Sequence, residues 1–224
     1  MYFLPFNVKI SVVGVIMDKK KAKNIIEALS LVFTDKPALK FSTPYELLVA
    51  VILSAQCTDE RVNKVTAVLF EKYNTPEKML TLKQEELEKY IYSCGFYRAK
   101  AGYILSASKD IIEKFGGEVP NNLTDLRSLA GVGRKTANVV YSVAFKGNAI
   151  AVDTHVFRVS NRIGLAKEKD VLKTELALMK IIDEKDWSRA HHYIIYLGRS
   201  FCKAQKPDCE NCPINKECEK HLKR

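Results

Sequence analysis

A glycine turn that opens directly into a helix constrains the fold of this 224-residue chain more than any other feature. Residues 129–140 read Leu-Ala-Gly-Val-Gly-Arg-Lys-Thr-Ala-Asn-Val-Val, with Gly131 and Gly133 inside the turn. Glycine adopts backbone angles that side chains forbid, so consecutive N–H groups can converge on one anion. The following helix adds the positive end of its dipole. We expect helices over residues 124–129 and 134–145, joined by a tight hairpin that can bind a phosphate.

The rest of the chain also has the pattern of consecutive helices. Thr-Pro-Tyr-Glu at residues 43–46 is a capping box with proline at the first helical position, and residues 47–54 are apolar enough to be buried on all sides. Residues 149–152 resemble a strand, but this run is short and suits a buried connector. Further helices are expected over residues 20–33, from Thr58, Thr75 and Thr81, and over residues 98–115, 154–162, 170–182 and 186–201. The expected fold class is therefore all-α.

The charge balance favours a polyanionic partner. The chain has 36 basic and 26 acidic residues, a net charge of +10. Because the basic residues are spread along the chain rather than gathered in a tail, nucleic acid is the leading candidate. A lysine-rich surface without a specific partner remains an alternative on charge alone.

The first 17 residues are mostly apolar, with Lys9 as their only charge and Pro5 as an interruption. They have no basic leading region and no small-residue cleavage site, and they are short for a membrane span. We expect an ordered or frayed extension, or an upstream start codon before a start at Met17. A membrane anchor is the alternative.

Lys135 is placed on the first turn of the helix that follows the glycine turn. Both the helix dipole and the adjacent Arg134 disfavour its ammonium form, which predicts a lowered pKa. A neutral amine is the nucleophile needed to attack the C1′ carbon of a DNA sugar. The alternatives are a lysine that contacts a phosphate and a solvated surface lysine.

Asp153 follows the apolar connector in the sequence Val-Asp-Thr-His at residues 152–155. It can be an N-cap that accepts a backbone hydrogen bond. It can also activate Lys135 and stabilise the positive charge that grows on a sugar as its base leaves. Both roles are compatible, because a capping carboxylate is fixed in position. The nearby His155 is a candidate contact to the DNA backbone or the substrate.

Four of the six cysteines are close together near the C-terminus, as Cys202-x6-Cys209-x2-Cys212-x5-Cys218. Four thiolates at these spacings can hold zinc or an iron–sulfur cluster, and spacing alone favours zinc. The remaining cysteines, at positions 57 and 94, are expected to be buried reduced thiols inside helical segments.

These features together resemble the endonuclease III family of the helix-hairpin-helix DNA glycosylases. The likeness runs from about residue 20 to the C-terminal region. It rests on the glycine hairpin, on residues 152–155, on Leu-Ser-Ala-Gln at residues 53–56 and on the four-cysteine spacing. It implies a base excision repair enzyme that removes oxidised pyrimidines from damaged double-stranded DNA and then, as an AP lyase, cleaves the strand 3′ to the abasic site.

The resemblance also implies roles for individual residues. Lys135 would be the Schiff-base nucleophile and Asp153 its catalytic carboxylate. Gln56 would fill the gap that an extruded base leaves in the duplex. Phe96 stands where the family usually has a leucine wedge, and Ala130 where it usually has proline. The hairpin residues Gly131, Val132, Gly133 and Arg134 would contact DNA, and Cys202, Cys209, Cys212 and Cys218 would hold a [4Fe–4S] cluster.

We expect two helical domains, with Lys135 and Asp153 facing each other across a cleft. The central domain, residues 37–147, would contain the helix-hairpin-helix motif. The second domain would combine residues 20–36 and 148–224 and include the cluster loop, while residues 1–19 would be an extension. We further expect a cytoplasmic monomer, associated with the nucleoid through DNA and not with a membrane.

Two alternatives to this function remain open. The first is a glycosylase of the same fold that acts on mismatched bases. The second is a non-catalytic DNA-binding protein that uses only the hairpin and the basic surface. The second alternative predicts tight duplex binding without strand scission, and the presence of both Lys135 and Asp153 argues against it.

Overall fold

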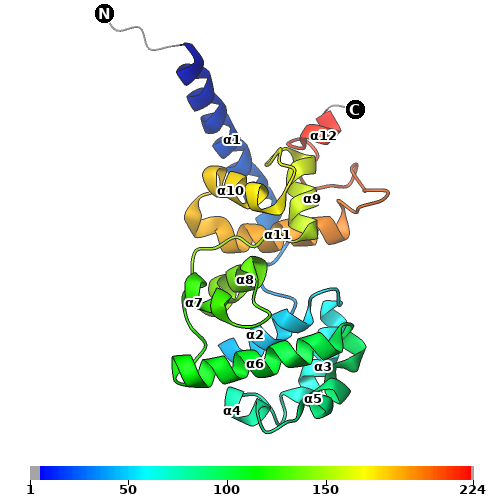
Figure 1. Ribbon diagram of the computed structural model, residues 1–224. Helices are drawn as coiled ribbons and strands as arrows, with labels where there is room; N and C mark the ends of the chain where they lie inside the picture. The colour runs from blue at the N-terminus through cyan, green and yellow to red at the C-terminus, as the bar shows by residue number, and fades with distance from the viewer. Residues whose placement is uncertain (1–5, 223–224) are drawn as a thin grey trace, which may run out of the picture. The chain divides into compact units, whose positions relative to one another are not determined.

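The protein is described by a computed structural model over residues 6–222, with side chains over residues 18–221, and this part contains helices and no strand (Figure 1). The all-α prediction is confirmed. α1 (Phe6–Ser30) begins well before the predicted residue 20. The prediction of an extension or an upstream start over residues 1–17 falls outside the described side chains. Within the described part, no helix combines the length and apolar character needed to cross a bilayer.

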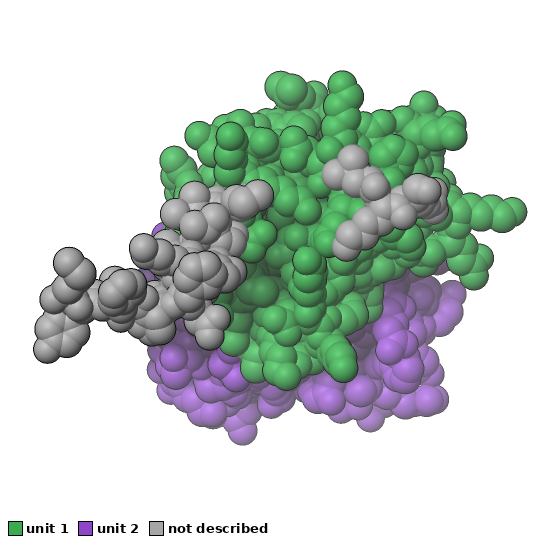
Figure 2. Space-filling view, turned by 90° about the horizontal axis from the view of Figure 1, so that it is seen from above, with its two compact units in different colours: residues 1–36, 150–224 green, residues 37–149 purple. Residues whose placement is uncertain are grey.

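The chain divides into two compact units, coloured green and purple in Figure 2. Unit 1 combines Met1–Lys36 with Ile150–Arg224, and unit 2 is Pro37–Ala149. The glycine hairpin belongs to unit 2, and the four clustered cysteines belong to unit 1.

Unit 2 is built around α2 (Pro44–Leu53), whose residues from Tyr45 onward are all buried, as predicted. The Thr43 hydroxyl caps this helix by accepting from the Glu46 N–H at 3.1 Å. The other helices of the unit are α3 (Asp59–Leu69), α4 (Pro76–Met79), α5 (Gln84–Ile91), η1 (Tyr92–Cys94), α6 (Tyr97–Phe115), α7 (Leu123–Ser128) and α8 (Arg134–Ala144).

Two helix starts in unit 2 differ slightly from the expectation. α5 begins at Gln84, the last residue of the start predicted over residues 81–84, and the Thr81 hydroxyl donates to the Lys78 carbonyl at 2.8 Å instead of capping the helix. α7 is capped by Asn122, whose side chain accepts from the Asp125 N–H at 2.9 Å. Both differences are local, since threonine and asparagine compete for neighbouring backbone groups at helix ends.

Unit 1 packs α9 (Thr154–Ile163) against α11 (Trp187–Ser200), with α1 against α11 and α10 (Val171–Ile181). η2 (Glu184–Asp186) precedes α11, and α12 (Glu219–Leu222) packs on α9. The core of the unit includes Ile25, Val156 and Ile194, each 0 % exposed. The prediction that residues 149–152 are a buried connector is confirmed, because Ile150 and Val152 are both buried. These residues form no strand.

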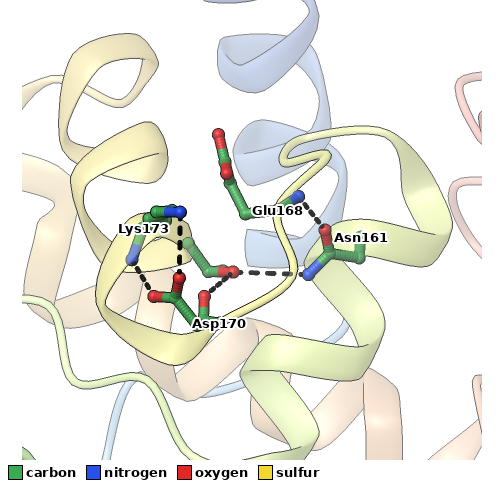
Figure 3. A network of polar contacts seen from close by, with 5 residues as sticks. Asn161, Glu168, Asp170 and Lys173 are labelled. Atoms are coloured by element: carbon green, nitrogen blue, oxygen red, sulfur yellow. Dashed lines mark hydrogen bonds and ion pairs between the residues drawn. The ribbon is translucent and has the colours of Figure 1, made fainter.

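A polar network ties the loop after α9 to α10 (Figure 3). The Asn161 side chain accepts from the Glu168 N–H at 2.7 Å and donates to the Thr174 hydroxyl at 3.4 Å. Asp170 caps α10 through the Lys173 N–H at 2.8 Å, and its second oxygen is 3.5 Å from Lys173 Nζ. These bonds hold the C-terminal end of α9, the helix whose N-terminus is capped by Asp153.

The buried position of α2 gives a direct stability prediction. Leu47→Ala removes a side chain that is 0 % exposed and should lower the free energy of unfolding by about 2–5 kcal/mol through lost burial and a residual cavity. Leu80→Ala, at a leucine that is 38 % exposed, is the matched control and should cost less than about 1 kcal/mol. Denaturant unfolding followed by circular dichroism measures both, and equal losses would contradict the packing described here.

Candidate active site

The glycine turn joins α7 to α8 as predicted. The Val132 N–H donates to the Leu129 carbonyl at 3.1 Å, and the Val132 side chain is buried, which pins the turn to the unit. Gly133 is the N-cap of α8, and glycine has no side chain with which to cap the helix. The first N–H groups of a helix have no intrahelical acceptor. The N-terminus of α8 is therefore where the predicted phosphate contact would be made.

The two glycines serve different purposes, which corrects the expectation that both need special backbone angles. Gly131 has a φ of +74°, and a Cβ there would lie 2.7 Å from the Cβ of Tyr103 on α6. Gly133 has φ −78° and ψ 177°, which any residue adopts, and a Cβ there would meet nothing within 4 Å. Gly131 is required by the fold, whereas the open space over Gly133 leaves the backbone accessible to a ligand.

Arg134 and Lys135 are the first two residues of α8. Arg134 is exposed and Lys135 is half-buried. Both thus lie beside the backbone donors of the turn, at the positive end of the helix dipole. The lowered pKa of Lys135 stays a prediction.

Asp153 is the N-cap of α9, as its sequence position predicted. Its Oδ1 accepts from the Val156 N–H at 2.7 Å, which fixes the carboxylate at the start of the helix. The connector before it is held by His191, whose Nδ1 donates to the Ala151 carbonyl at 2.6 Å. Asp153 belongs to unit 1 and Lys135 to unit 2, so their facing each other stays a prediction.

His155 lies in the first turn of α9 and is half-buried. The His155 Nδ1 is 3.5 Å from Nη2 of Arg158. A Cβ at Gly198 on α11 would lie 3.2 Å from the His155 Nδ1. The small residue at position 198 therefore makes room for the imidazole. Its contact with DNA stays a prediction.

Gln56 and Phe96 share two unusual properties within unit 2. Both have left-handed backbones, with φ of +52° and +48°, and both side chains are exposed, Phe96 by 69 %. Non-glycine residues in this region store strain, and such strain clusters at functional sites. An exposed aromatic ring and an exposed amide on strained turns are consistent with insertion into a base stack.

A buried lysine that the sequence analysis did not identify joins these two turns. Lys100 on α6 is 4 % exposed, and its Nζ donates to the carbonyls of Leu53 at 2.9 Å, Ala55 at 2.7 Å and Cys94 at 2.6 Å. Burial lowers its pKa. The available signal was its position on the apolar face of α6, one turn before the buried Ile104.

The two cysteines outside the C-terminal group are neighbours rather than isolated thiols. Cys94 lies in η1 and is buried, while Cys57 is half-buried in the turn after α2. Burial, together with the adjacent Cys57 thiol, raises the pKa of Cys94 to about 12. Cys94 thus stays protonated, and the expectation that Cys57 lies inside a helix is wrong.

The four C-terminal cysteines line one small pocket, together with Arg162 and His221. Burial raises the pKa of Cys212, and the other three thiols of the set add to this effect. The His221 Nδ1 is buried there without a hydrogen-bond partner. No group of three or more histidine, cysteine or carboxylate side chains in the described chain is arranged to hold a metal ion. Four thiols around one pocket are the donor set that zinc or an iron–sulfur cluster requires.

Arginines of α9 hold the cysteine loop. Arg158 Nη2 donates to the carbonyls of Gly198 at 3.0 Å and Cys202 at 2.9 Å. Arg162 Nη1 donates to the Lys203 carbonyl at 2.6 Å and lies 3.6 Å from the Cys202 sulfur. The helix that begins with Asp153 therefore also anchors the loop.

Comparison with known proteins agrees with this geometry. Residues 49–184 match the family model described as HhH-GPD superfamily base excision DNA repair protein. Endonuclease III of Bacillus subtilis is 54 % identical over 83 % of this chain and 85 % of its own length. That of Rickettsia prowazekii is 50 % identical over 82 % and 87 %.

The chain is also similar in fold to solved structures of endonuclease III and of another DNA glycosylase. A trapped covalent intermediate of endonuclease III with DNA superposes with a TM-score of 0.87 at 48 % identity, covering 92 % of this chain and 98 % of that one. A thermostable thymine-DNA glycosylase superposes with a TM-score of 0.80 at 27 % identity, with the same coverage. The fold and the hairpin thus define a DNA-binding repair enzyme of the DNA glycosylase class. The chain belongs to the endonuclease III family of the HhH-GPD superfamily.

The different roles of the two glycines can be tested. Gly131→Ala should destabilise the protein by more than about 1 kcal/mol, because alanine is strained at φ +74° and would contact Tyr103. Gly133→Ala should change stability by less than about 1 kcal/mol but weaken duplex DNA binding about tenfold, because its methyl group covers the backbone donors. Thermal unfolding and fluorescence anisotropy measure the two effects. Unchanged DNA affinity in Gly133→Ala would contradict the assigned phosphate contact.

Proposed function

We propose that this protein excises oxidised pyrimidines from duplex DNA and then cleaves the strand by β-elimination through a Lys135 Schiff base. The observation that carries the proposal is Lys135 itself, an amine on the first turn of the helix that follows the glycine hairpin. The solved structure of a trapped covalent endonuclease III–DNA intermediate, 48 % identical to this chain, supports a covalent route. A hydrolytic glycosylase would not require an amine at this position.

Base release begins with extrusion of the damaged nucleotide, which costs less where the lesion has weakened its pairing. Asp153 accepts a proton from the Lys135 ammonium, and the resulting amine attacks C1′ of the sugar. The bond from C1′ to the base breaks, and the base leaves with that electron pair and takes up a proton. The fixed carboxylate of Asp153 stabilises the positive charge that develops on the sugar.

Strand cleavage requires the sugar ring to open first: the nitrogen gives up a proton, the bond between C1′ and the ring oxygen O4′ breaks as a C=N bond forms, and O4′ takes up a proton. The product is an open-chain iminium that joins Lys135 to C1′. The positive nitrogen makes a proton on C2′ acidic, and its removal leads to breakage of the bond between C3′ and its oxygen. The 3′ phosphate leaves with that electron pair. Water then hydrolyses the imine and restores the Lys135 amine.

The hairpin and the two strained turns position the DNA in this proposal. The backbone N–H groups of Gly131 and Gly133, with the Arg134 side chain, bind a phosphate and set the register of the strand, while Val132 holds the turn through its own N–H bond to the Leu129 carbonyl. Gln56 and Phe96 occupy the space that the extruded base leaves. The exposure of both side chains supports this role.

We assign the cysteine cavity to a [4Fe–4S] cluster held by Cys202, Cys209, Cys212 and Cys218. The donor chemistry, the shared cavity and the unpartnered His221 nitrogen at its wall support the assignment. When bound, the cluster supplies covalent cross-links that fold a loop otherwise poor in helix. Arg158 and Arg162 connect that loop to α9.

We further propose that the protein acts as a monomer on chromosomal DNA in the cytoplasm. The net charge of +10 supports attraction to DNA without a partner subunit.

The imine can be trapped with borohydride on a labelled duplex that contains one thymine glycol. Wild type should give a covalent adduct, and Lys135→Ala should give none, because the nucleophile is missing. Asp153→Asn should form it at least about 100-fold more slowly, since proton transfer is lost. Denaturing electrophoresis measures the adduct and the strand cleavage. Base release without an adduct in wild type would contradict the lyase mechanism.

The cluster assignment predicts the metal content of the purified protein. Iron and acid-labile sulfide should be present in equal amounts, with no stoichiometric zinc. Cys212→Ala should lose both and lower the thermal unfolding temperature, because the loop loses its cross-links. Elemental analysis with a sulfide assay measures this, and a colourless protein with one zinc would overturn the assignment.

A further inference from the structure

We propose that Lys100 is a positioning residue that fixes Gln56 and Phe96 for insertion into the DNA base stack. This inference rests on the proposed function and deepens it. It names the side chain that holds the turn of Gln56 and the turn of Phe96 at a fixed distance from each other. Lys100 does not contact DNA in this proposal. It acts through the backbone of both turns.

The side chain uses its full hydrogen-bonding capacity inside the protein. An ammonium group carries three N–H donors, and Lys100 Nζ lies within 2.9 Å of three backbone carbonyls. A protein tolerates a buried ammonium group when each of its N–H donors has an acceptor. Removing an acceptor leaves a donor unsatisfied and destabilises the folded state. These bonds are therefore strong constraints on the positions of the carbonyls.

The three carbonyls lie next to the two inserting residues. Leu53 is the last residue of α2, and Ala55 lies in the turn after it, directly before Gln56. The third belongs to Cys94, two residues before Phe96. The ammonium thus joins turns that are about 40 residues apart in the chain, and each turn continues into a residue with a left-handed backbone.

The left-handed backbones explain why such a constraint is needed. A non-glycine residue in this region is strained, so a turn released from its neighbours relaxes toward another conformation. Relaxation would move the side chains of Gln56 and Phe96 away from the stack. A misplacement of about 1 Å can cost on the order of 100-fold in rate.

The test compares two DNA substrates with the variant Lys100→Met, which keeps the length of the side chain and removes the ammonium. On duplex thymine glycol, single-turnover base excision should fall on the order of 100-fold. On single-stranded DNA with one abasic site, borohydride trapping should stay within about twofold of wild type, because there is no duplex gap to fill. Lys109→Met is the matched control on the exposed side of α6, and both activities should be retained.

A purely structural role for Lys100 predicts equal losses on both substrates, and that result would overturn the proposal, as would full duplex activity in Lys100→Met. If the methionine variant does not fold, Lys100→Arg replaces it, since arginine keeps the charge but cannot place three donors at one point. It should show the same preferential loss on duplex DNA. Wild type inactive on both substrates would instead refute the proposed function.

A double-mutant comparison isolates the route of the effect. In a Gln56→Ala, Phe96→Ala background, Lys100→Met should cause no further loss of duplex excision, because the side chains it positions are gone. An additional loss equal to that seen in wild type would show that Lys100 acts independently of them and would overturn the proposal.

Discussion

The backbone N–H groups at the start of an α-helix have no acceptor within the helix, and this constraint decides where the chemistry of the protein lies. α8 follows Gly133, which has no side chain to cap it, and Lys135 lies on the first turn of that helix. α9 solves the same problem with the Asp153 carboxylate. In the proposed mechanism the nucleophile and the acid–base group therefore both lie at helix N-termini. One of these helices follows a glycine without a capping side chain, and the other is capped by a carboxylate.

The surrounding packing keeps these helix starts in place. Gly131 lets the hairpin approach Tyr103 on α6, and the same helix carries Lys100, whose ammonium holds the turns of Gln56 and Phe96. In unit 1, Asp153 caps the start of α9, and the same helix carries Arg158 and Arg162, which bind the cysteine loop. Each unit therefore has one helix that connects its reactive or inserting residues to its structural core.

Features that depend on neighbouring residues could be predicted from the sequence. The threonine cap of α2, the Asp153 cap and the hairpin all rest on hydrogen bonds or turns within a few residues. Lys100 could not be assigned, because its acceptors at Leu53 and Ala55 are distant in sequence and are brought to it only by packing. The prediction that Gly133 needs a backbone angle reserved for glycine was wrong, because the sequence does not show whether a glycine in a turn has a positive φ.

The identity of the lysine that attacks C1′ is the central claim of this account. Borohydride reduction of wild type bound to a thymine glycol duplex, followed by nuclease and protease digestion and tandem mass spectrometry, locates the sugar remnant on the protein. We expect a single modified residue, Lys135. A remnant on another lysine or on an α-amino group would contradict the mechanism, even if strand cleavage were observed.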